Sequence, residues 1–206
     1  MAKNAINCEG CHRLGDFLEA VKKDFHKASK IYKFNCDDYK YGKSCFKYGN
    51  YSFLGKGCKA DLDRAFEYYS IGCENASPES CLHAGLMLTS TKKEEKKPWK
   101  KDYVKGLEFL DKGCQGKNGT SCYFASGIFI TGAPDVPKNM EKAFEYSQKA
   151  CELDNIHACA NLSQMYRKGD GVKKDTSLAQ KYKDKALEMQ EQIKKGFRQI
   201  EFEQGT

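Results

Sequence analysis

The amino-acid sequence predicts an all-α fold, a right-handed solenoid of helical hairpins, on three observations. Val and Ile together number only 12 of 206 residues and there are four prolines, which favours helix over sheet. Four of the eleven cysteines recur at intervals of 37, 41 and 37 residues, the period of a helical-hairpin array. Each is followed by a second cysteine, with seven or eight residues between them. The pairs are Cys36 and Cys45, Cys73 and Cys81, Cys114 and Cys122, and Cys151 and Cys159.

Other residues keep the register of these cysteines. A small residue stands eight positions before each leading cysteine, namely Ala28, Ala65, Gly106 and Ala143. A large apolar residue stands five positions before it, namely Ile31, Tyr68, Phe109 and Tyr146. Another small residue follows the second cysteine by four positions, namely Gly49, Gly85, Ser126 and Ser163. In the first copy, Cys11 and Gly15 stand at the positions of the second cysteine and of the small residue that follows it. In the last copy, Ala179, Tyr182 and Leu187 stand at the positions of the small residue, the large apolar residue and the leading cysteine. Small residues at fixed offsets let two helix backbones approach closely.

The register therefore predicts two helices per copy. We expect helices at 8–20, 24–36, 42–54, 61–74, 78–90, 102–114, 119–131, 139–152, 156–167 and 175–195. Gly55, Gly57, Gly169 and Gly171 lie where left-handed helix ends are needed, and Asp61, Asp63 and Asp175 lie at helix starts. The predicted organisation is one solenoid over 1–196, with repeats at 8–36, 42–74, 78–114, 119–152 and 156–195, and a C-terminal tail at 197–206.

The cysteine spacing places the end of one hairpin beside the start of the next. A short turn there would bring the two Cα atoms to about 5.5 Å, within disulfide reach. We therefore predict the disulfides Cys36–Cys45, Cys73–Cys81, Cys114–Cys122 and Cys151–Cys159. The alternatives are reduced cysteines that pack as small core residues, and a zinc site, for which the usual paired C-x-x-C spacing is missing.

Three further cysteines stand outside these pairs. Cys8, Cys11 and His12 form a C-x-x-C-H motif, the attachment signature of c-type haem, although the repeat phase already explains Cys11. Cys58 lies in a predicted loop as a candidate reactive thiol. Haem or redox chemistry at Cys8, Cys11, His12 and Cys58 is the alternative to a structural role, and otherwise we expect no cofactor. His83 and His157, each near a junction cysteine, are either edge histidines or haem or copper ligands.

The charge pattern argues against nucleic acid as a partner. The net charge of +7 comes from 31 lysines and only four arginines, whereas readers of bases and phosphates favour arginine. The densest basic run is Lys92–Lys101. We expect it to form a solvated loop, or to contact an anionic membrane surface or an acidic partner. We expect neither a membrane-spanning helix nor a secretory signal.

Signals for an enzyme are weak. Two Ser-x-x-Lys matches, Ser44–Lys47 and Ser90–Lys93, are about what chance gives with so many lysines, and the other β-lactamase elements are missing. No phosphate-binding loop, dinucleotide fingerprint or zinc-protease motif occurs. We therefore expect no metal site and no catalytic residues.

Particular runs resemble a known family. Gly169-Asp-Gly171-Val-Lys-Lys-Asp175, preceded by Ala-Asn-Leu-Ser-Gln-Met-Tyr166, resembles a Sel-1-like repeat, a relative of the tetratricopeptide repeat. The junction cysteines resemble the branch that contains bacterial Hcp proteins and the cytochrome c oxidase assembly factor 7 family. The residues most similar to that family are Phe34-Asn-Cys36-Asp, Gly132-Ala-Pro-Asp-Val-Pro-Lys138 and the run from Lys149 to Asn161.

The resemblance implies a non-enzymatic adaptor that supports respiratory-chain assembly, mainly of cytochrome c oxidase. It implies protein partners in that assembly and in the oxidative import machinery of the mitochondrial intermembrane space. That address also reconciles many cysteines with the lack of a secretory signal. The alternative function is a thiol-redox protein, or one that handles haem or copper, in the same pathway.

Overall fold

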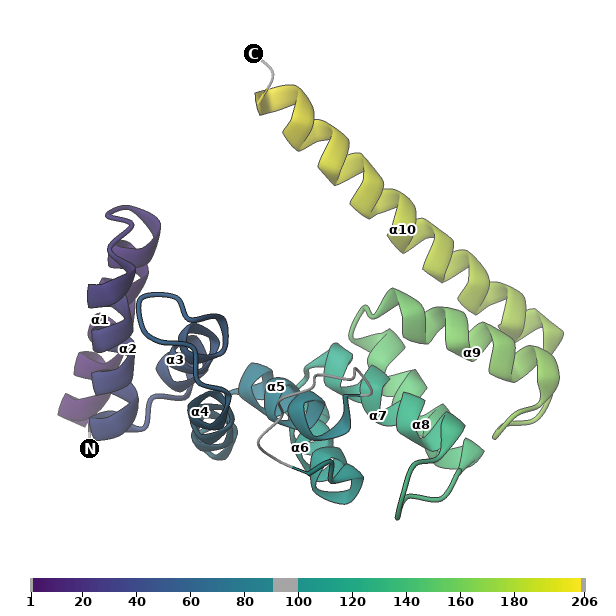
Figure 1. Cartoon of the computed structure of the whole chain (residues 1–206). Coiled ribbons are helices and arrows are strands. Elements are labelled where there is room, and N and C mark those ends of the chain that lie inside the picture. The colour runs from purple at the N-terminus through teal and green to yellow at the C-terminus, as the bar shows by residue number, and fades with distance from the viewer. Residues whose placement is uncertain (1, 91–99, 205–206) are drawn as a thin grey trace. The chain divides into compact units, whose positions relative to one another are not determined.

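Helical hairpins account for the computed structural model, which describes residues 2–90 and 100–204 (Figure 1). The chain divides into two units, residues 1–117 and 118–206. The helices of the first unit are α1 (Ala2–Ala20), α2 (Phe25–Tyr39), α3 (Gly42–Leu54), α4 (Leu62–Glu74), α5 (Pro78–Thr89) and α6 (Tyr103–Gln115). Those of the second are α7 (Gly119–Thr131), α8 (Met140–Glu152), α9 (Ile156–Lys168) and α10 (Thr176–Gln204). Within each unit every helix packs on the next one along the chain.

The expected helices all form, and the described residues contain no strand, so the all-α prediction is confirmed. Three boundaries differ by more than two residues: α1 begins at Ala2, α2 continues to Tyr39, and α10 continues to Gln204 through most of the segment assigned to a tail. Strong helix formers explain the length of α10, because Glu, Gln and Lys are frequent over residues 188–204 despite the single Gly196. The run Lys92–Lys101 falls almost wholly outside the described residues, and only Lys100 and Lys101 are seen, both exposed.

Local signals set the helix ends as the sequence indicates. The Asp61 carboxylate accepts a hydrogen bond from the Arg64 N–H at 2.9 Å, and Asp175 accepts one from Leu178 at 2.9 Å. Gly55 and Gly169 end α3 and α9 in the left-handed conformation, with φ of 69° and 83°. These glycines allow the sharp reversal between the two helices of a hairpin.

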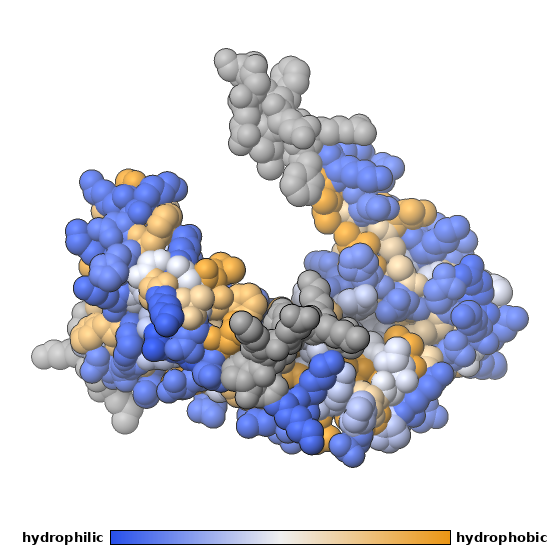
Figure 2. Space-filling model, in the orientation of Figure 1, coloured by the Kyte–Doolittle hydropathy of each residue, from blue (hydrophilic) through white to orange (hydrophobic). Residues whose placement is uncertain are grey.

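Glycines on the first helix of the first two hairpins bring an aromatic ring close to the helix backbone. A Cβ atom at Gly15 would lie 2.5 Å from the Tyr32 ring, and one at Gly49 would lie 2.7 Å from the Tyr69 ring. Tyr32 of α2 and Tyr69 of α4 are almost wholly buried, and each also belongs to a core cluster that its helix forms with the next helices along the chain. Hydrophilic residues cover most of the surface around these cores, with apolar residues exposed in patches (Figure 2).

This packing predicts opposite effects for two glycine-to-alanine changes in helices. Gly49→Ala should lower the free energy of unfolding by about 1–3 kcal/mol, because the new methyl group overlaps the fixed Tyr69 ring. Gly127→Ala in α7 meets no atom within 4 Å and should raise stability by up to about 1 kcal/mol through helix propensity. Thermal unfolding followed by circular dichroism separates them, and equal shifts of the same sign would refute this packing.

Candidate functional site at the hairpin junctions

Each junction joins the last turn of one hairpin to the first turn of the next through a disulfide. Cys36 bonds to Cys45, Cys73 to Cys81, and Cys151 to Cys159, with Cα–Cα distances of 4.8, 4.6 and 4.7 Å. All six of these cysteines are buried. Cys114 and Cys122 are each disulfide-bonded as well. Their bond to one another stays a prediction from the spacing.

The turn inside each junction contains one residue with a strained, left-handed backbone conformation that its residue type does not predict. The residue five positions before the second cysteine has positive φ, although it is not glycine. These residues are Lys40, Ala76, Lys117 and Asp154, with φ of 52°, 57°, 66° and 59°. The left-handed conformation costs about 1–2 kcal/mol for such residues. A ring of about nine residues closed by a disulfide contributes roughly 2.5 kcal/mol in the chain-entropy model, enough to offset that cost.

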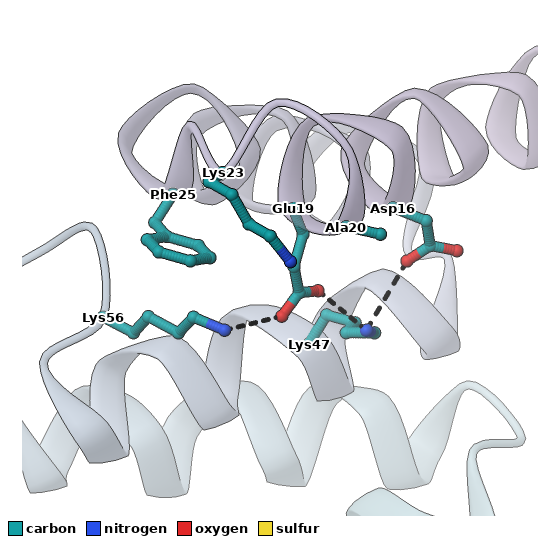
Figure 3. A pocket seen from close by; sticks show the side chains of 7 residues that line it. All are labelled: Asp16, Glu19, Ala20, Lys23, Phe25, Lys47 and Lys56. Carbon is teal, nitrogen blue, oxygen red and sulfur yellow. Dashed lines mark hydrogen bonds and ion pairs between the residues drawn. The ribbon is translucent and has the colours of Figure 1, made fainter. Parts of the chain in front are cut away.

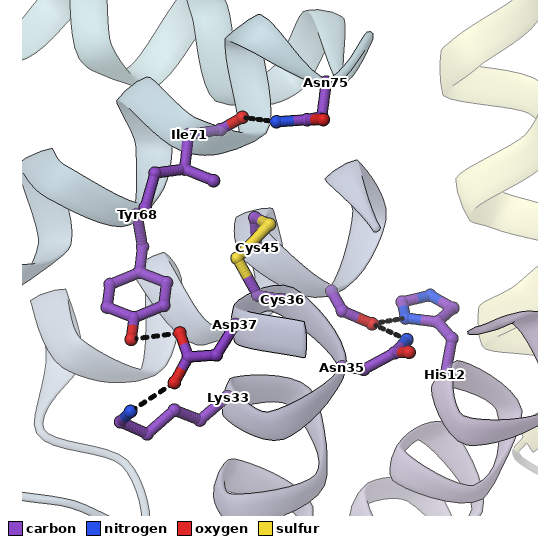
Figure 4. Close-up of a disulfide and its surroundings, with 10 residues drawn as sticks. His12, Lys33, Asn35, Cys36, Asp37, Cys45, Tyr68, Ile71 and Asn75 are labelled. Carbon is purple, nitrogen blue, oxygen red and sulfur yellow. Dashed lines mark hydrogen bonds and ion pairs between the residues drawn. A yellow bond between two sulfur atoms is a disulfide. The ribbon is translucent and has the colours of Figure 1, made fainter. Parts of the chain in front are cut away.

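The first junction has a buried polar residue before each of its cysteines (Figure 4). Asn35 and Ser44, which immediately precede its two cysteines, are both fully buried. The Asn35 amide donates to the Ser44 hydroxyl at 2.7 Å and to the Cys8 carbonyl at 2.8 Å. At the last junction the corresponding residues are Ala150 and Ala158, also fully buried. The polar link therefore ties α1 to the junction between α2 and α3.

His12 completes this link. Its Nδ1 lies 2.9 Å from the Ser44 hydroxyl, and its Nε2 lies 3.6 Å from an Asp16 carboxylate oxygen. The ring packs between Tyr32 and Tyr41, at centroid distances of 5.6 and 5.4 Å. Burial lowers the pKa of His12 and outweighs the opposing effect of Asp16. His12 is thus a neutral structural residue near pH 7.

The candidates for haem or redox chemistry are only partly brought together. Cys8, which is buried, and Cys11, which is half-buried, lie with His12 on α1, whereas Cys58 lies in the loop after α3. An axial haem ligand needs a free imidazole nitrogen, but both nitrogens of His12 face protein groups. The residues therefore do not fit haem at this motif, and we derive no step through it. Nowhere in 2–90 and 100–204 do three metal-ligating side chains converge.

His83, His157 and the Ser-x-x-Lys matches are the remaining candidates for ligand binding or catalysis. His83 stacks on Tyr69 at 5.0 Å, and burial lowers its pKa. His157 is exposed beside Tyr123. Ser44 is enclosed, and Lys47 turns away from it to bond Glu19, so the first Ser-x-x-Lys match is not an open nucleophile. The second match extends into residues outside the described part of the chain.

A charged cleft of about 510 Å³ lies between α1, the start of α2 and α3 (Figure 3). Glu19 accepts hydrogen bonds there from Lys47 and Lys56, both at 2.9 Å. Lys56 also lies 4.2 Å from the centre of the Phe25 ring. Burial alone would raise the pKa of Glu19, but the two ammonium groups lower it to about 2. Sequence reasoning missed this clamp, because no spacing rule links Glu19 to lysines 28 and 37 positions away.

Comparisons with known proteins fit this architecture. The chain matches the Sel1 repeat family over residues 42–77, 100–118, 120–155 and 156–190. A Sel1 repeat protein from Oxalobacter formigenes has the same fold, with a TM-score of 0.75 and 22% identity, covering 88% of this chain and 72% of that one. A protective antigen of uropathogenic Escherichia coli gives a TM-score of 0.64 and 19% identity, covering 87% of this chain and 45% of that one. The chain is therefore a Sel1 repeat protein, as its sequence predicts.

Two named relatives show to which family of Sel1 repeat proteins the chain belongs. The chain is 46% identical to the cytochrome c oxidase assembly factor 7 homolog of Drosophila melanogaster, over 96% of this chain and 86% of that protein. It is 38% identical to cytochrome c oxidase assembly factor 7 of Homo sapiens, over 94% of this chain and 85% of that protein. The chain belongs to the cytochrome c oxidase assembly factor 7 family.

Removal of one junction disulfide should loosen the array locally. The paired change Cys151→Ser and Cys159→Ser should lower the free energy of unfolding by about 2–3 kcal/mol and increase hydrogen exchange in α8 and α9. Cys58→Ser, which leaves every junction intact, is the control and should change stability by less than about 1 kcal/mol. Unchanged denaturation and exchange in the paired variant would rule out a stabilising role for this junction.

The Glu19 clamp predicts a pH-dependent contribution to stability. Because the folded pKa lies below the unfolded value of 4.5, its stabilisation is complete above about pH 5 and is lost as the pH falls towards 2. Glu19→Gln should therefore cost about 1–2 kcal/mol at pH 7, after allowance for solvent screening, and almost nothing near pH 2. Urea unfolding across this range measures the gap, with exposed Glu108→Gln as control. A gap independent of pH would contradict the clamp.

Proposed function

We propose that this chain supports the assembly of cytochrome c oxidase as a non-enzymatic adaptor in the mitochondrial intermembrane space. The observation that carries the proposal is a buried disulfide at successive hairpin junctions in a chain whose relatives are named as oxidase assembly factors. Such bonds form where thiols are oxidised and are rare in the reducing cytosol. In the described part of the chain, no helix is both long and apolar enough to cross a bilayer.

The adaptor role follows from what the fold can offer a partner. A solenoid has only contacts between neighbours, so it bends easily unless its junctions are restrained. Disulfides restrain them, and a rigid surface loses less entropy when it holds an unassembled subunit. The partners are oxidase subunits or their helpers, and the oxidative import machinery that forms the disulfides. The lysine run Lys92–Lys101 offers a contact with the anionic inner membrane.

A non-enzymatic mechanism is supported by the roles of the reactive side chains. His12, Ser44 and His83 all make internal packing or hydrogen-bond contacts. The proposal therefore requires no cofactor and no turnover. Among the described residues, no group of three metal-ligating side chains supports the alternative, in which thiols or a bound haem or copper ion do the work.

Loss of the protein from cells that express it should reduce the amount of assembled oxidase on native gels. Wild-type protein should restore it, and so should a variant with Cys8→Ala, Cys11→Ser, His12→Gln and Cys58→Ser, because these residues supply no chemistry. The variant with both Cys151→Ser and Cys159→Ser should restore it poorly. Normal oxidase levels without the protein would contradict the assembly role. If the fourfold variant is folded but does not restore the oxidase, the redox alternative is favoured.

A further inference from the structure

The cleft between α1, α2 and α3 has one positive charge more than its internal ion pairs neutralise. It is lined by three lysines, two carboxylates and two apolar residues. Lys47 bonds to both carboxylates, at 2.9 Å to Glu19 and 3.5 Å to Asp16. Lys56 bonds to Glu19 alone, at 2.9 Å. The third lysine supplies the charge in excess.

That third lysine is Lys23, whose side chain reaches the cleft from the turn after α1 (Figure 3). Within residues 2–90 and 100–204, no carboxylate forms an ion pair with Lys23. Lys56 has donors to spare as well, because an ammonium carries three N–H groups and Glu19 accepts from only one of them. Its position is held by the Phe25 ring, whose centre lies 4.2 Å away. Two ammonium groups thus offer N–H donors to an anion from outside the protein.

The repeat packing alone does not call for these charges. Relative to the second cysteine of each repeat, the position of Glu19 is held by Phe53 in α3. The position of Lys47 is held by His83 in α5. The next hairpin therefore packs with an aromatic ring and an imidazole where the first has the ion pair. The charged cleft is a feature of the first hairpin and not of the repeat.

The cleft also lies on a side of the array that a preceding hairpin leaves open. Phe53 and Leu54 in α3 hold the positions of Glu19 and Ala20 in α1. They are 41 and 69% exposed, although α1 and α2 precede them. The opening of the cleft thus follows from the side that it faces, whatever precedes α1.

The lining residues indicate a ligand with one negative charge and an apolar neighbour. Lys23 and Lys56 supply the donors, whereas the two carboxylates of the cleft repel a second negative charge and so disfavour a phosphate dianion. Phe25 and Ala20 offer an apolar contact beside the ammonium groups. The volume of about 510 Å³ is within the range of about 300–1,000 Å³ that is usual for ligand sites. A carboxylate next to an apolar side chain, as an acidic peptide presents it, matches these groups.

We propose that the cleft binds an acidic peptide segment of a partner protein, with a carboxylate between the ammonium groups of Lys23 and Lys56 and an apolar side chain on Phe25. Charge complementarity of this kind favours one partner over others. Glu19 competes with the bound carboxylate for Lys56, so loss of the Glu19 charge strengthens binding although it weakens the fold. The proposal rests on the cleft alone and does not depend on the oxidase role.

A small acidic peptide tests the proposal with the whole protein. The probe is acetyl-Phe-Glu-amide, and NMR chemical shifts of the isotope-labelled protein follow its binding during a titration at low salt. We expect shifts in α1, α2 and α3 and a dissociation constant of about a millimolar. The uncharged acetyl-Phe-Gln-amide should bind about tenfold more weakly, because it cannot pair with either ammonium group.

Three variants of the protein separate the binding role from a structural one. Lys23→Met should weaken binding about threefold and leave thermal unfolding unchanged, because Lys23 has no internal ion pair to lose. Lys22→Met removes the neighbouring exposed lysine, which does not line the cleft, and is the matched control that should bind as wild type does. Glu19→Gln should bind about threefold more tightly.

The signs of these effects decide the outcome. Circular dichroism verifies that each variant is folded. Absence of shifts in α1, α2 and α3, equal binding by Lys23→Met and wild type, or weaker binding by folded Glu19→Gln would each overturn the proposal. Equal binding of the acidic and the uncharged peptide would show that the cleft takes apolar groups and not carboxylates, and would equally overturn it.

Discussion

The structure depends on how the end of one hairpin is held against the start of the next. At the junctions that contain Cys36–Cys45, Cys73–Cys81 and Cys151–Cys159, a short turn brings two helix ends to within 5 Å between Cα atoms, and a buried disulfide fixes them there. In each turn one residue that is not glycine adopts the left-handed conformation, so the disulfide and the backbone strain occur at the same place. Because a solenoid has contacts only between neighbours, these short rings and the packing of adjacent helices hold successive hairpins together within each unit.

The first hairpin adds polar and charged contacts to this scheme. His12, Ser44 and Asn35 form a polar link at its junction, and Glu19 accepts hydrogen bonds from Lys47 and Lys56. These contacts hold α1 against α2, α3 and the loop that follows α3.

Much of this could be predicted from the sequence, because the decisive signals are local and repeat. The cysteine spacing predicts the junctions, and Gly55 and Gly169 predict the left-handed helix ends. The strain at Ala76 and Asp154 could not be foreseen, since neither residue type favours positive φ. Contacts such as His12 with Ser44 join residues 32 positions apart, and no periodicity relates them. The sequence leaves the role of His12 in the C-x-x-C-H motif open for this reason, because its contact with Ser44 is one that only the fold brings about.

If the junctions hold the hairpins together, the junction cysteines are bonded in the working protein. Thiol trapping measures this: cells are quenched in acid, the protein is unfolded and alkylated, and each cysteine is assigned by mass spectrometry. We expect the eight junction cysteines to escape alkylation unless the sample is first reduced. Alkylation of both members of any junction pair in unreduced samples would contradict it.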